Sequence, residues 1–136
     1  MRRPPITVYV LTLAAIGLIV LMTLEALHGR VYGSFPEAKG WYWGGAIRLA
    51  QWLESSLGCG DCLAAETFSW PILVVGLTWI GAVVAFWLRL SWAVRSILIL
   101  GVFSLTFWIP GTLLTLILLT NLWLKPTKIW FSGAYE

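Results

Sequence analysis

The chain has 136 residues, of which 60% are hydrophobic and 11% are charged, and its formal net charge is +3. A soluble domain carries roughly 25% charged residues, so this sequence cannot cover a core with polar surface and is predicted to lie in a lipid bilayer. Its basic residues occur singly or in pairs, which excludes a nucleic-acid-binding face. The expected fold class is an all-α membrane protein without a separate soluble domain.

The first apolar run, Ile6 to Leu24, contains no charge and has about the ~20 residues that a membrane span requires. This run is longer than the apolar part of a signal peptide, and no small-residue cleavage pattern follows it. The sequence therefore predicts an uncleaved transmembrane helix over residues 6–27.

Residues 28–67 follow as a loop on the outside of the membrane. Between Trp41 and Leu57 the apolar residues recur every three or four positions, which predicts an amphipathic helix that Gly58 is suited to end. The apolar stripe consists of Ala46, Leu49, Ala50, Leu53 and Leu57. We expect this interfacial helix to lie on the outer membrane surface or against the outer mouth of the bundle.

The second apolar run, Thr67 to Leu88, is also uncharged and predicts a span over residues 68–88. Ser69 is expected to cap this helix and Pro71 to occupy its first turn, where a missing N–H costs little. Gly81 and Ala85 form a small-xxx-small pair, which permits the close approach of another helix.

The third apolar run, Ser96 to Leu124, has two interpretations because Pro110 and Gly111 interrupt it. It forms either one kinked helix or a hairpin of two spans, over residues 90–108 and 111–124. Asn121 is the one buried-looking amide of this region and is expected to bond across helices.

The positions of the basic residues favour the hairpin, with both termini inside. Arg2 and Arg3 before the first span indicate a cytoplasmic N-terminus. Four spans then place six basic residues inside and three outside: Arg2, Arg3, Arg89, Arg95, Lys125 and Lys128 inside, and Arg30, Lys39 and Arg48 outside. A single third helix would move two lysines outside and weaken this asymmetry. We predict a multi-pass protein of the cell inner membrane with four transmembrane helices.

Both cysteines lie in the outside loop, in the sequence Cys59-Gly60-Asp61-Cys62. In an oxidising periplasm a structural disulfide is the default state. Quinone-linked disulfide-forming membrane enzymes are similar in having four helices and an outer cysteine pair, but they use a second pair that this chain lacks. Asp61 also disfavours the reactive thiolate. Zinc would need about two further ligands, so no metal site is predicted.

Aromatic residues are unusually frequent, with ten tryptophans in the chain. Most fit the belts at the two membrane surfaces. Four are candidate contacts for a partner protein, lipid, quinone or pigment: Trp41, Trp43, Trp52 and the mid-span Trp79. The single histidine, His28, is a weak candidate ligand for a haem or pigment and is otherwise a polar residue at the membrane surface.

No set of residues with the spacing of a catalytic motif is found, and the spans are expected to hold no ionisable residue away from their ends. We therefore expect a non-catalytic accessory or assembly subunit of a larger inner-membrane complex, for example an electron-transfer or photosynthetic one. Its expected partners are the bilayer and other membrane subunits, which would hold any pigment or quinone; the sequence identifies no cofactor. Two alternatives stay open, a thiol-disulfide oxidoreductase that uses Cys59 and Cys62, and a carrier of small molecules or lipids.

Overall fold

The computed structural model describes residues 3–37, 39–40, 44–60, 62–105 and 111–133. Within these ranges the secondary structure is helical, which confirms the predicted all-α fold class. The helices are α1 (Ile6–Tyr32), α2 (Gly45–Leu57), α3 (Ala65–Trp87), α4 (Ala93–Ser104), α5 (Gly111–Trp123) and α6 (Lys125–Ser132).

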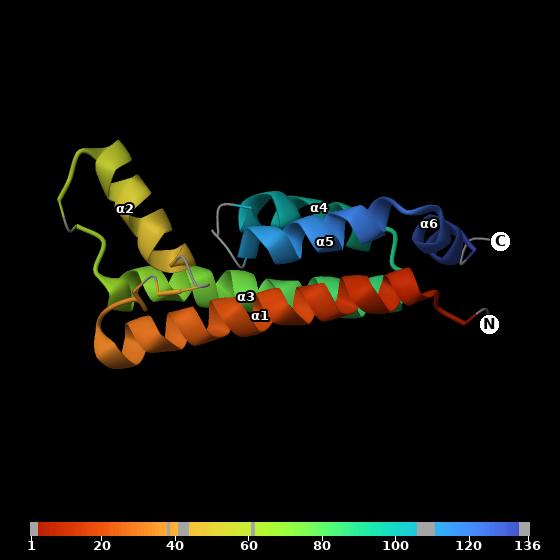
Figure 1. Ribbon diagram of the computed structural model, residues 1–136, viewed down its shortest axis with the longest axis horizontal. Helices are drawn as coiled ribbons and strands as arrows, with labels where there is room; N and C mark the ends of the chain where they lie inside the picture. The colour runs from red at the N-terminus through yellow and green to blue at the C-terminus, as the bar shows by residue number, and fades with distance from the viewer. Residues whose placement is uncertain (1–2, 38, 41–43, 61, 106–110, 134–136) are drawn as a thin grey trace.

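Helices α1 and α3 run antiparallel along the length of the molecule (Figure 1). At one end the Trp87 indole N–H donates to the Thr12 hydroxyl at 3.0 Å. At the other end the Arg30 guanidinium donates to the Glu66 carbonyl at 3.3 Å. We call the first of these the terminal end, because both chain termini lie there, and the second the loop end, because α2 lies there (Figure 1).

The sequence sets the length and the buried face of α1. Pro5, with φ −70° and ψ 161°, is extended and stands just before the helix, where a residue without an N–H costs nothing. Gly33 ends the helix at φ 67°, a left-handed conformation that glycine adopts without strain. The residues buried between these two positions recur at spacings of three and four: Val8, Leu11, Ala15, Leu18, Met22, Glu25 and Gly29.

Helix α3 begins earlier than the sequence predicts. It starts at Ala65, so Pro71 lies in its second turn rather than its first, and Ser69 is not its cap. The Ser69 hydroxyl donates instead to the carbonyl of Glu66 at 2.8 Å, inside the helix. Proline is tolerated there because its missing N–H costs the helix only one hydrogen bond, the one to the carbonyl of Thr67. This position is close to the helix end, where the backbone groups are already incompletely bonded.

Helices α1 and α3 are long and apolar enough to cross a membrane, whereas α4 and α5 are shorter. With 12 residues in α4 and 13 in α5, each is roughly 18–20 Å long at 1.5 Å per residue. A hydrocarbon core is about 30 Å thick. The break between the two predicted helices is present, but four complete spans are not shown. The predicted turn itself, with Trp108 and Pro110, lies outside the described residues.

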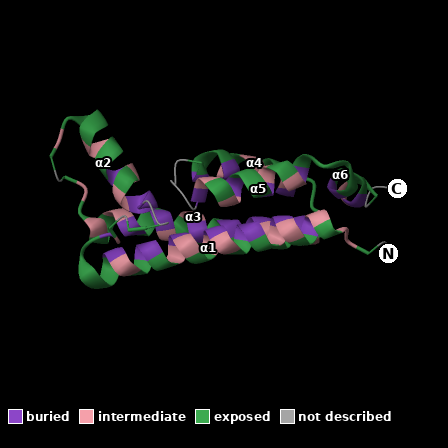
Figure 2. Ribbon diagram, viewed as in Figure 1, coloured by how far each residue is buried: buried purple, intermediate pink, exposed green. Residues whose placement is uncertain are grey.

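The hairpin of α4 and α5 packs on the α1/α3 pair over the half next to the terminal end (Figure 1). The buried faces of the two layers meet between them, as Figure 2 shows. Trp79 of α3 and Ser104 at the end of α4 are both fully buried, and the Trp79 indole N–H donates to the Ser104 hydroxyl at 3.0 Å. This hydrogen bond fixes the end of α4 near the middle of α3.

Helix α2 leaves the loop end at a steep angle to α1 and α3 (Figure 1). Its first turns are buried through Gly45, Ala46 and Ala50, whereas Leu57 in its last turn is 68% exposed. Gly58 ends the helix at φ 69°. The predicted helix in the loop is thus confirmed over residues 45–57, although the bundle covers only the beginning of its apolar stripe.

Candidate functional site

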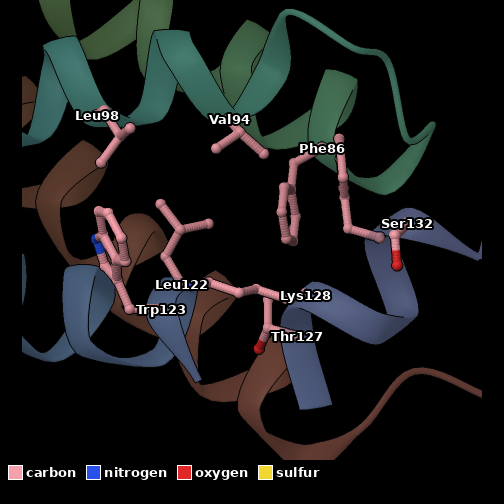
Figure 3. Close-up of a pocket in the computed structure, with 9 residues that line it drawn as sticks. Phe86, Val94, Leu98, Leu122, Trp123, Thr127, Lys128 and Ser132 are labelled. Atoms are coloured by element: carbon pink, nitrogen blue, oxygen red, sulfur yellow. The ribbon is translucent and has the colours of Figure 1, made fainter. Parts of the chain in front are cut away.

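A cavity of about 300 Å³ lies at the terminal end, between α4, α5 and α6. We call it the α6 cavity. Figure 3 shows Val94 and Leu98 facing it from α4 and Leu122 and Trp123 facing it from α5. Phe86, at the end of α3, and Phe131 of α6 stack on each other with their ring centres 5.4 Å apart and complete its apolar wall.

Helix α6, which the sequence analysis did not predict, supplies the polar rim of this cavity. Thr127, Lys128 and Ser132 line it. The Thr127 hydroxyl is engaged with the hydroxyl of Thr7 at 2.7 Å, which ties α6 to the start of α1. The Lys128 ammonium lies 4.6 Å from the centre of the Trp123 ring, a cation–π distance, and its side chain is exposed.

A more polar pocket of about 480 Å³ lies at the loop end and contains His28, Ser34 and Glu37 in its lining. Nδ1 of His28 is 2.6 Å from the carbonyl oxygen of Ser34. A carbonyl only accepts hydrogen bonds, so Nδ1 of His28 is the donor in this contact. Among the described residues, no group of three or more His, Cys, Asp or Glu side chains could hold a metal ion.

Glu25 is an ionisable residue inside the bundle, and the sequence analysis missed its position. It lies on the buried stripe of α1 and is 2% exposed. The end of the apolar run at Leu24 suggested the membrane surface, but α1 continues for two turns beyond Glu25. The sequence feature that indicates the burial of Glu25 is its spacing of three residues from Met22. This spacing places Glu25 on the same helical face as Met22, which packs against α3.

The cysteine pair lies in the exposed loop between α2 and α3. Cys59 and Cys62 are at bonding distance and form a disulfide, with their Cα atoms 5.8 Å apart. Cys62 is exposed and Cys59 is partly exposed. Asp61 lies outside the described residues. The Glu54 carboxylate accepts a hydrogen bond from the backbone N–H of Leu63 at 2.8 Å, which ties this loop back to α2.

The four tryptophans that were predicted to contact a partner or ligand differ in their exposure. Trp52 of α2 is 64% exposed and offers a surface. Trp79 is 0% exposed, so the prediction of a contact outside the chain is wrong for this residue, whose indole holds the hairpin instead. Trp41 and Trp43 lie outside the described residues.

The residues that were predicted to pack between helices also differ in their exposure. Ala85 is buried, but Gly81 is exposed, and a Cβ added there would meet nothing within 4 Å. Gly81 therefore makes no close helix contact with the described residues. The Asn121 amide donates to the Ile117 carbonyl of its own helix at 2.8 Å, and the predicted bond across helices stays a prediction. A backbone acceptor one turn away satisfies one N–H of this amide without a second helix.

Gly29 of α1 lies close to Phe35, in the segment after α1, and to the backbone of α3. A Cβ built on it would lie 2.8 Å from the Phe35 ring and 3.2 Å from the backbone oxygen of Ala65 in α3.

No protein-family model matches this chain, and no curated protein and no solved structure is significantly similar to it.

Proposed function

We propose that this chain is a multi-pass protein of the inner membrane that serves as a non-catalytic accessory or assembly subunit of a larger membrane complex. The observation that carries this proposal is the apolar outer surface of the bundle. Large apolar side chains are exposed along α1, α3, α4 and α5, among them Leu13 (67%), Leu24 (62%), Leu77 (57%), Ile99 (71%) and Leu113 (55%). Soluble monomers rarely expose so much apolar surface, so lipid or a partner helix is its natural cover.

In this proposal α1 and α3 are the two spans, and α4 and α5 form a re-entrant hairpin that enters the inner half of the bilayer and returns. Their short length supports this arrangement in place of two further spans. Backbone that turns within the bilayer must be buried in protein. Ser104 and Gly111, which flank the turn, are both buried.

The proposed orientation places the terminal end in the cytoplasm. Arg3, Arg89, Arg95, Lys125 and Lys128 all lie at this end, which is the basic excess that the positive-inside rule associates with the cytoplasmic side. The loop end, with α2 and the disulfide, then faces outward. Both termini are inside, as they are with four spans.

Mild-detergent extraction followed by native-size analysis tests the role as a subunit. We expect the chain to migrate in one discrete particle with other membrane subunits, in fixed stoichiometry. Trp52→Ser should release it from the particle by removing an exposed apolar contact on α2, whereas Trp92→Ser, a change at a residue 51% exposed at the terminal end, should not. A wild-type chain that migrates alone would overturn the proposed role.

The exposed disulfide favours one second candidate, a periplasm-facing thiol-disulfide oxidoreductase. The double variant Cys59→Ser/Cys62→Ser separates the two. A four-residue loop limits the stabilisation by the disulfide to about 2 kcal/mol, so an accessory subunit should still assemble. An oxidoreductase would keep its assembly and lose all thiol-oxidising activity of the purified particle.

A further inference from the structure

The walls of the α6 cavity suit a hydrocarbon chain. Val94, Leu98, Leu122, Phe86 and Phe131 present apolar side chains from four helices, as Figure 3 shows for the first four. Its volume of about 300 Å³ is at the small end of the range for ligand sites. A polar ligand would have to leave its hydrogen bonds with water and would find few replacements here.

Among the described residues at the polar rim of the cavity, Lys128 has free capacity for an anion. Thr127 is engaged with Thr7, and the Ser132 hydroxyl donates to the carbonyl of Ile129 at 3.3 Å. Lys128 is exposed, and its ammonium contacts the face of the Trp123 ring. An ammonium has three donors, so this contact leaves Lys128 able to bind an oxyanion at the mouth of the cavity.

The charge of the surrounding surface selects an anionic ligand. Five basic residues lie at the terminal end: Arg3, Arg89, Arg95, Lys125 and Lys128. Each Asp or Glu among the described residues belongs to the loop-end half of the molecule, namely Glu25, Glu37, Glu54 and Glu66. Basic pockets between membrane helices on the cytoplasmic side bind the headgroups of anionic lipids.

We propose that the α6 cavity binds one acyl chain of an anionic phospholipid, whose phosphate contacts Lys128. The combination of an apolar cavity with a cation at its rim matches such an amphiphile. A zwitterionic lipid also carries a phosphate, but its cationic group would meet the surrounding bases and be repelled. This inference goes beyond the role as a subunit, and it applies to the purified chain without any partner.

Native mass spectrometry of the purified chain tests the proposal. The chain in a non-ionic detergent is given phosphatidylglycerol, phosphatidylcholine or a free fatty acid of the same chain length. We expect one phosphatidylglycerol to be retained in preference to the other two. Lys128→Gln should weaken its binding about tenfold, because a hydrogen bond to a charged group is lost. Leu98→Trp should abolish it by filling the cavity.

Two matched controls lie outside the cavity lining. Lys125→Gln removes the same charge at the same end of the molecule, and Ile99→Trp adds the same bulk to α4 at a position 71% exposed. Both should retain the lipid as the wild type does. Circular dichroism and gel filtration establish that each variant is folded, and Lys128→Gln tests the site even where Leu98→Trp does not fold.

Three results would each overturn the proposal. One is equal retention of phosphatidylcholine and phosphatidylglycerol. Another is preference for the free fatty acid, which would make the cavity a carboxylate site. The third is equal loss of lipid in Lys125→Gln and Lys128→Gln, since binding would then follow the overall charge rather than the residue at the rim.

Discussion

Replacement of Trp79 by alanine should lower the free energy of unfolding by about 3 kcal/mol, the low end of the range for a buried tryptophan. Trp79 is 0% exposed and joins α3 to the tip of the α4/α5 hairpin through Ser104. In a bilayer the unfolded helices still keep this side chain in an apolar surrounding, so the transfer term is small and the unfilled cavity dominates the loss. Reversible unfolding in mixed micelles measures the change.

Two further variants separate packing from the hydrogen bond. Trp79→Phe retains a ring and loses the bond to Ser104, and interhelical hydrogen bonds in membranes contribute about 0.6 kcal/mol on average. We therefore expect Trp79→Phe to cost about 1 kcal/mol. Trp70→Ala, on the same helix at a position 52% exposed, should cost less than that. Equal losses in Trp70→Ala and Trp79→Ala would contradict the placement of Trp79 in the core.

Replacement of Gly29 by leucine should destabilise the contact between α1 and α3 by about 1–3 kcal/mol. The new side chain would meet the Phe35 ring and the backbone oxygen of Ala65. The ring can turn aside, but the backbone oxygen moves only if the helices separate. Leucine is also the better helix former by roughly 1 kcal/mol, so a net loss shows that overpacking exceeds the gain in propensity.

Gly81→Leu is the matched control for this substitution. It makes the same change within a helix, at an exposed position where an added Cβ meets nothing within 4 Å. The stability of the purified Gly81→Leu chain should be unchanged or slightly higher, because only the difference in helix propensity between glycine and leucine remains. Thermal unfolding in detergent compares the two variants. A Gly81→Leu chain less stable than Gly29→Leu would show that the close contact between α1 and α3 is misplaced.

Hydropathy predicted the long helices well, because the property that identifies them is continuous along the chain. The apolar run of α1 lies within the observed helix, and that of α3 extends one residue beyond it, to Leu88. Gly33 ends α1 and Gly58 ends α2, because glycine can take a left-handed conformation there. Helix α2 was predictable for a similar reason. Its apolar residues repeat with the helical period, a purely local signal.

The features that hydropathy missed depend on tertiary packing. The run from Ser96 to Leu124 has no charged residue and is interrupted only at Pro110 and Gly111, so it does not reveal that the described part of α4 ends at Ser104. Helix α6 begins with Lys125 and Pro126 and resembles a polar tail until Thr127 and Trp130 pack on the bundle, where they are 1% and 6% exposed.

The candidate site was missed for the same reason. Lys128 became notable only when α6 placed it at the mouth of a cavity formed with three other helices. Glu25 appeared to belong to the membrane surface because a charge after an apolar run usually marks its end. Its burial follows from the helical face that it shares with Met22, which matters only once α3 covers that face.

The central claim is that the α4/α5 hairpin ends inside the bilayer, because this depth decides between two membrane spans and four. Leu105→Cys, made in the Cys59→Ser/Cys62→Ser background, places a single thiol at the described tip of α4. Intact cells stripped of their outer membrane are treated with a membrane-impermeant maleimide, before and after permeabilisation. Ser55→Cys on α2 should react from outside, and Lys125→Cys only after permeabilisation.

A re-entrant hairpin predicts that Leu105→Cys reacts in neither condition and becomes accessible only after denaturation in detergent. Its thiol then lies within the hydrocarbon region, near the level of Trp79, where the aqueous reagent does not enter. Reaction of Leu105→Cys from outside, at a rate close to that of Ser55→Cys, would contradict the account and show that α4 and α5 cross the membrane.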